Sequence, residues 1–155
     1  MKKKSPWTDT LHSPINVLNH ADCLHLEKFT DADLDDIAGC TDVYELKLYG
    51  SKTGEPIDLA RLAHITELRF LELERVPFKN LGALKALPHL RHLLIKNGGF
   101  TDFDELNGFN ALQSLFLWYN KLTRFPAGLD LPQLGSLKAT LIKVHAPAWC
   151  CVTGR

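Results

Sequence analysis

The sequence lacks an excess of charge of either sign, because 18 lysine and arginine residues are balanced by 18 aspartate and glutamate residues. A general nucleic-acid binder needs a basic surface that displaces counterions from the phosphate backbone, and a polybasic membrane anchor needs a run of basic residues. The sequence also lacks an apolar run near the roughly 18 residues of a membrane-spanning helix. The composition therefore predicts no nucleic-acid partner and no membrane partner.

The pattern of a signal peptide is missing as well. The cationic start MKKKSPW is followed by Thr8, Asp9, His12, Ser13 and Pro14, which interrupt any apolar core that a signal peptide would need. We therefore expect a cytoplasmic protein.

Cysteine is scarce, and its spacing does not suit a metal site. The four cysteines are Cys23, Cys40, Cys150 and Cys151, and none belongs to a CxxC pair. Because no second cluster offers zinc spacing, we expect free thiols, no metal and no other cofactor. Cys40 falls at an apolar place of the repeat described below, and we interpret it as a small buried residue.

Motifs of common catalytic sites are also missing. The chain has no GxxxxGK loop that would cradle a phosphate and no GxSxG turn that would present a nucleophilic serine. The ligand spacing of an EF-hand calcium loop is missing too. These absences favour a protein that performs no catalysis.

What the sequence does contain is an internal repeat. Residues 90–100 (LRHLLIKNGGF) and 112–122 (LQSLFLWYNKL) carry apolar residues at places 1, 4, 6 and 11, and the two segments are offset by 22 residues. The pattern recurs in both directions, with one three-residue insertion between the second and third copies. The six copies begin at Ala21, Val43, Leu68, Leu90, Leu112 and Leu134. A fixed period in the twenties indicates a solenoid of stacked coils.

This repeat resembles the leucine-rich repeat family, and its spacing is similar to that of phosphatase-regulator-type and internalin-type repeats. The resemblance covers about residues 21 to 144. It implies an α/β fold, a right-handed β-α superhelix of about six coils with a parallel sheet on its concave face. It also implies a recognition scaffold, because such repeats mostly bind other proteins.

The resemblance divides the chain into three parts. Residues 1–20 are predicted to cap the amino end of the stack, residues 21–145 form the repeat domain, and residues 146–155 form a carboxyl-terminal tail. For the tail two alternatives stay open. Either Trp149 folds over the last coil, or the tail is disordered or not native.

One place departs from the family pattern. The family usually has asparagine at the ninth place of each coil, where its side chain bonds to loop backbone between coils. Here only Asn120 fits, and the other five copies hold Phe29, Ser51, Val76, Gly98 and Ile142. We therefore expect the turns after the strands to be less regular than in the family.

The second half of each coil is predicted to return through a short helix or an extended arm. Thr30 or Asp31 can cap a helix in the first coil, where acidic residues suit the positive end of the helix. Residues 58–64 are predicted to be helical. Residues 102–105 are interpreted as the opening turn of a short helical segment capped by Thr101, rather than as a cation site.

Alternation along each strand places residues 1, 4 and 6 in the core and residues 3, 5 and 7 on the outer face. Stacking of parallel strands turns each outward place into a row across the sheet. Row three is Cys23, Glu45, Phe70, His92, Ser114 and Ser136. Row five is His25, Lys47, Glu72, Leu94, Phe116 and Lys138. Row seven is Glu27, Tyr49, Glu74, Lys96, Trp118 and Thr140, and place 8 adds Arg75, Asn97 and Tyr119.

Bulky apolar residues gather on this grid in the third to fifth coils: Phe70, Leu94, Phe116, Trp118 and Tyr119. An exposed strand face is expected to be polar unless it binds something, and an apolar centre with a charged rim is typical of a protein-binding patch. The predicted partner-binding set is completed by Glu72, Glu74, Arg75, His92, Lys96 and Lys138. The alternative is that a loop or a terminal segment of the same chain covers the apolar residues.

Histidines and carboxylates on the grid raise the alternative of a small enzyme. His25 and His92 are three coils apart, or about 14 Å at the usual strand spacing, so they cannot share a metal ion. Glu72 and Glu74 lack an apolar pocket that would raise the pKa of either carboxyl. The adjacent strands offer lysines opposite these two residues, so we interpret them as members of cross-strand ion pairs with Lys47 and Lys96.

The sequence thus predicts a non-catalytic module that binds another protein through its concave strand face. Two alternatives remain at this point. One is a dedicated inhibitor, such as an immunity protein that neutralises a bacterial toxin, and the other is a small enzyme that uses His92 and nearby carboxylates. An exposed aromatic patch could also join two copies of the chain as a homodimer.

Overall fold

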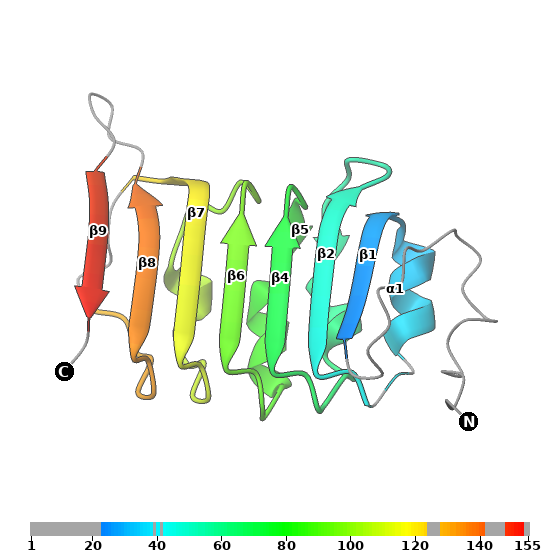
Figure 1. The fold of residues 1–155 in the computed structure, drawn as a ribbon, viewed down its shortest axis with the longest axis horizontal. Coiled ribbons are helices and arrows are strands. Elements are labelled where there is room, and N and C mark those ends of the chain that lie inside the picture. Colours follow the sequence, from blue (N-terminus) through cyan, green and yellow to red (C-terminus); the bar gives the residue numbers. More distant parts are fainter. Residues whose placement is uncertain (1–22, 39, 41, 124–127, 142–147, 154–155) are drawn as a thin grey trace.

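The computed structural model describes residues 23–38, 40, 42–123, 128–141 and 148–153 of the chain. It is a mixed α/β fold built on one mostly parallel sheet (Figure 1). The predicted capping segment, residues 1–20, lies outside the described residues. Ile142, at the ninth place of the sixth repeat, also lies outside them.

Seven strands form the main sheet, in the order β1-β2-β4-β6-β7-β8-β9. The first six run parallel to their neighbours: β1 (Cys23–Phe29), β2 (Glu45–Ser51), β4 (Phe70–Glu74), β6 (His92–Lys96), β7 (Ser114–Leu122) and β8 (Ser136–Leu141). The seventh, β9 (Ala148–Thr153), pairs antiparallel with β8. A second sheet pairs two short strands, β3 (Ile57–Asp58) and β5 (Phe78–Lys79).

The register of the main sheet follows the 22-residue repeat. Row three is paired residue by residue from Cys23 through Phe70 to Ser136, and row five from His25 through Leu94 to Lys138. The three-residue insertion leaves this register intact, because it lies in the exposed loop that follows β2. The predicted alignment of rows three and five is therefore confirmed.

Row seven departs from the prediction at its last member. The register between β7 and β8 shifts between Leu117 and Leu122, so Trp118 has no aligned partner on β8. Thr140 is only 9% exposed, so it is buried rather than accessible as a member of row seven. The prediction of Thr140 as the last member of row seven is therefore wrong, because the register shift leaves it out of line with Trp118.

Leucine-type residues at places 1, 4 and 6 fill one continuous core beneath the sheet. In the third, fourth and fifth coils the fully or almost fully buried residues at these places are Leu68, Leu71, Leu73, Leu90, Leu93, Ile95, Leu112, Leu115 and Leu117. Burying one such side chain contributes roughly 1.5 to 3 kcal/mol. The same stripe in every coil is what holds the strands in register.

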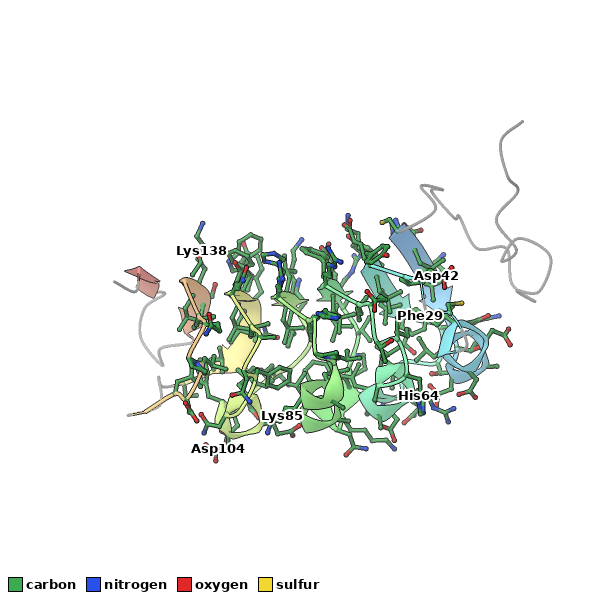
Figure 2. The ribbon with its side chains drawn as sticks, turned by 90° about the horizontal axis from the view of Figure 1, so that it is seen from below. Phe29, Asp42, His64, Lys85, Asp104 and Lys138 are labelled. Atoms are coloured by element: carbon green, nitrogen blue, oxygen red, sulfur yellow. The ribbon has the colours of Figure 1, made fainter. Side chains whose placement is uncertain are left out.

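The return segments lie on one side of the sheet as a row of short helices (Figure 2). They are α1 (Asp31–Ala38) and the 3-10 helices η2 (Leu59–Leu62), η3 (Leu81–Ala86) and η4 (Asp104–Leu106). Within the described residues, none of these helices is long and apolar enough to cross a membrane.

Thr30 caps α1, as predicted. The Thr30 backbone N–H donates to the Asp33 carboxylate at 2.7 Å, and the Asp33 backbone N–H donates to the Thr30 hydroxyl oxygen at 3.5 Å. This reciprocal pair satisfies two backbone donors at the start of the helix, where negative charge is also favoured.

The later return segments are tighter than predicted. Of residues 58–64, only Leu59–Leu62 are helical, as a 3-10 turn whose Ala60 N–H donates to the Asp58 carboxylate at 3.0 Å. The prediction of Thr101 as a cap was wrong. The Asp104 N–H donates instead to the Asp102 carboxylate at 2.8 Å, because an aspartate readily bonds backbone two residues ahead.

The turns after the strands are regular, which contradicts our expectation. Place 8 adopts a positive φ in five successive coils: Lys28 (52°), Gly50 (59°), Arg75 (54°), Asn97 (51°) and Tyr119 (54°). The backbone ladder continues through this turn, since the Arg75 N–H donates to the Lys96 carbonyl at 2.8 Å and the Asn97 N–H to the Trp118 carbonyl at 3.0 Å. Stacked parallel backbones therefore impose one turn on residues of different types, although a non-glycine residue there costs roughly 1 kcal/mol or more.

The carboxyl-terminal tail contributes the strand β9, which was not predicted. Its backbone pairs with β8 from Ser136 to Leu141, at the end of the sheet (Figure 1). The parallel edge of β8 is therefore paired by a strand of opposite direction, which ends the parallel series.

Candidate binding face

The two faces of the main sheet differ in what lies on them. Figure 2 shows Lys138 projecting from the sheet on the side away from His64, Lys85 and Asp104, which lie with the helical segments. We call the side of Lys138 the outer face; it carries rows three, five and seven. No described helix lies on it.

All eleven predicted partner-binding residues are accessible on this face or at its edge. Eight are partly exposed, namely Phe70, Glu72, Glu74, His92, Leu94, Lys96, Phe116 and Trp118, and three are exposed, namely Arg75, Tyr119 and Lys138. None of the rings is in the core.

The outer face of β6, β7 and β8 carries an apolar cluster, which we call the aromatic half (Leu94, Phe116, Trp118, Tyr119 and Lys138). The Phe116 and Trp118 rings are 5.7 Å apart between centroids, and the Lys138 ammonium lies 5.6 Å from the Phe116 centroid. Leu94 is the register partner of Phe116 on the adjacent strand. Flanking contacts of this kind bury part of each ring and leave the rest on the surface.

Tyr119 is the most exposed member of the aromatic half. It is 57% exposed and is the single large hydrophobic residue in the exposed class among the described residues. Tyr119 follows Trp118 in the chain, and its positive φ interrupts the regular alternation of side chains along the strand. An aromatic ring held in solvent by a repeated backbone turn is a ready contact point.

The outer face of β1, β2 and β4 is different, and we call it the charged half (His25, Glu27, Glu45, Lys47, Tyr49, Glu72 and Glu74). The predicted pair of Glu74 and Lys96 is confirmed, with 3.1 Å between the Glu74 Oε2 and the Lys96 Nζ. The predicted pair of Lys47 with Glu72 is wrong. The Lys47 Nζ lies 2.6 Å from the Glu45 Oε1, because residues two apart on one strand share a face.

Interactions within the charged half affect its titrating groups. The hydrogen bond to the Glu45 carboxylate raises the pKa of Lys47. Burial, together with the nearby Glu72 carboxylate, raises the pKa of Tyr49, so its phenol is neutral at physiological pH. The His25 ring packs against the Tyr49 ring with 4.4 Å between centroids and a tilt of 45°, and the His25 Nε2 lies 3.6 Å from a Glu27 oxygen. The charged half therefore pairs largely with itself.

His92, the histidine of the enzyme alternative, contacts an aromatic ring. The His92 ring packs 6.3 Å from the Phe70 ring. No carboxylate forms an ion pair with His92 in the part of the chain that the structure describes. Over the same residues, no three histidine, cysteine or acidic side chains gather as metal ligands.

A shallow groove of about 460 Å³ lies at the edge where β4, β6 and β7 end. Arg75, Asn97 and Tyr119 line it from the repeated turn, and the rest of its lining is Pro77, Gly98, Gly99 and Lys121. The sequence placed three of these residues at place 8 but did not predict a groove. The available signal was the periodic place 8, but strict alternation would turn this place toward the core.

Asn120 holds the backbone beneath this groove. Its side chain is fully buried; its Oδ1 accepts from the Gly98 and Phe100 N–H groups at 3.0 and 3.3 Å, and its Nδ2 donates to the Ile95 carbonyl at 2.8 Å. The role expected for a ninth-place asparagine, bonding to loop backbone between coils, is therefore confirmed at Asn120.

Comparison with known proteins adds no functional name. No protein-family model matches the sequence, and no curated protein matches it.

Proposed function

We propose that this chain is a non-catalytic protein-binding module that docks a partner protein on the outer face of its sheet. The observation that carries the proposal is the aromatic half, where Leu94, Phe116 and Trp118 stand side by side on a sheet face that no described helix covers. Interface centres are rich in such aromatic residues, whereas ordinary exposed strands are polar.

We also propose that the fold is a leucine-rich repeat solenoid. Three observations support it: strands that recur with the 22-residue repeat, an unbroken register for rows three and five, and the same positive-φ turn at place 8 in five coils. Asn120 supports it further through its bonds to the loop of the preceding coil. A rigid ladder of this kind presents side chains without the entropy cost of ordering loops.

In this proposal the two kinds of residue on the face have different tasks. Trp118, Phe116 and Leu94 enter an apolar site of the partner and provide most of the binding free energy. Lys138, together with Lys96 paired to Glu74, lies at the rim and sets the orientation of the partner.

The proposal is tested by capturing partners from a native lysate with the immobilised protein, identifying them by mass spectrometry, and measuring affinity by calorimetry. Trp118→Ala should weaken binding of the captured partner by about 2 kcal/mol or more, which is roughly thirtyfold in Kd. Tyr49→Ala is the matched control, because Tyr49 occupies row seven in the charged half. Thermal denaturation checks that both variants remain folded.

Two results would contradict the placement of the interface. One is an unchanged affinity of the Trp118→Ala protein for its partner, and the other is an equal loss in the Tyr49→Ala protein. Sedimentation equilibrium of the wild type tests whether the partner is a second copy of the chain, in which case Trp118→Ala should favour the monomer.

A further inference from the structure

The groove at the edge of β4, β6 and β7 has a built floor. A side chain at Gly98 would place its Cβ 2.8 Å from the Ile95 side chain and 3.2 Å from the Phe78 ring, so glycine is required there. Gly99 has a φ of 75°, which also favours glycine. With Asn120 bonded to the Gly98 and Phe100 N–H groups, this loop is fixed before any ligand arrives.

The charges around the groove are positive and largely unpaired. Arg75 is 68% exposed in its side chain, and its ion pair with Glu74 uses only Nε, at 3.9 Å. The other oxygen of Glu74 bonds to Lys96 at 3.1 Å. Lys121 is exposed and forms no ion pair with any described residue. The lining residues found among the described part of the chain include no carboxylate.

Donors of three kinds therefore converge on one hollow. The terminal nitrogens of Arg75 form a planar fork that matches a carboxylate, the ammonium of Lys121 adds a second positive charge, and Asn97 adds an amide. Tyr119 forms the wall on the side of the aromatic half. A ligand that suits this groove thus has a negatively charged group for Arg75 and Lys121 and an apolar group that lies against Tyr119.

We propose that this groove binds an aspartate or glutamate carboxylate of an acidic partner segment, whose neighbouring apolar residue rests on Tyr119 and Trp118. The inference rests on the proposed function, because it names the chemistry of the partner that docks on the outer face. It adds Asn97 and Lys121 to the binding residues. A carboxylate seated here fixes the end of the partner segment along β7.

The test uses the full chain labelled with ¹⁵N and two capped peptides, Trp-Glu-Asp-Glu-Leu and its uncharged counterpart Trp-Gln-Asn-Gln-Leu. Titration with the acidic peptide should shift the backbone amide signals of Asn97, Gly98 and Gly99 in a saturable way. The uncharged peptide should leave these signals in place. Raising the salt concentration from about 50 to about 300 mM should weaken binding of the acidic peptide, since salt screens exposed charges.

Variants locate the charge that matters. Arg75→Gln and Lys121→Gln should each raise the Kd of the acidic peptide about fivefold, the size of a partly exposed ion pair. Arg91→Gln is the matched control, because Arg91 is exposed beside the start of β6, away from the groove, and should leave the Kd unchanged. Equal binding of the two peptides, or no effect of Arg75→Gln, overturns the inference.

Inorganic phosphate is the second probe. A lower Kd for phosphate than for the acidic peptide, from titration of the groove amides, would assign the groove to phosphate and overturn the carboxylate assignment. The outcome is separable from that of the proposed function. If Trp118→Ala releases the captured partner while the acidic peptide leaves the groove signals unchanged, the docking face stands and this inference fails. If the acidic peptide shifts those signals while the Trp118→Ala protein still binds its partner, the groove binds a carboxylate and the proposed docking face is wrong.

Discussion

The charged half and the aromatic half lie on one parallel sheet and present different side chains in the same rows. At row five the charged half holds Lys47 and Glu72, whereas the aromatic half holds Leu94 and Phe116 in the same register. Lys47 in the charged half pairs with Glu45 on the same strand, while the aromatic half leaves ring surface exposed. The repeat therefore sets the position of each side chain, and the residues at the outward places can vary to suit a binding partner.

Both halves depend on the same buried stripe, and the largest expected effect comes from removing part of it. Leu93→Ala should lower the free energy of unfolding by about 2 to 5 kcal/mol, because Leu93 is fully buried in the core. Leu94→Ala, one residue further on but on the outer face, should cost about 1 kcal/mol or less. Urea denaturation measures both, and similar losses would show that the two sides of β6 are misassigned.

A smaller but local effect is expected at the edge of the aromatic half. Asn120→Ala should cost about 2 to 3 kcal/mol, because it leaves the N–H groups of Gly98 and Phe100 without their acceptor. Asn110→Ala, at an exposed position, is the control. Hydrogen exchange should show faster exchange at Gly98 and Phe100 than in the charged half. Unchanged protection at these two amides would refute the role given to Asn120.

The smallest effect is expected at the boundary between the two halves, where Glu74 on β4 pairs with Lys96 on β6. Glu74→Gln should cost about 0.5 kcal/mol at low salt, and the difference should disappear in high salt, because a partly exposed pair is screened. Glu55→Gln, in the exposed loop after β2, provides the baseline. Denaturation at two salt concentrations checks this, and a salt-independent loss would indicate a packing role instead.

Much of the scaffold could be predicted because its signals are local and periodic. Leucines at places 1, 4 and 6 can be buried together only on one side of a strand, so the alignment of rows three and five followed from their spacing. Thr30 at the start of α1 and Asn120 beneath the groove were predictable for a similar reason, since each bonds to backbone close to it or one coil away.

Features that depend on competition between neighbours could not be predicted. Lys47 had two carboxylates within reach, and geometry selected Glu45. The register shift between β7 and β8 takes Thr140 out of row seven, and alternation carries no sign of this shift. The groove needs the ends of three strands at once, so its residues are far apart in the sequence and meet only in the stack.

The amino-acid sequence by itself determined which residues are buried and which strands align, because burial of a periodic apolar stripe has one low-energy register. The regular turn at place 8, the strand β9 and the cationic groove could be seen only in the folded chain, since each arises from hydrogen bonds and charges that come together after the strands have paired.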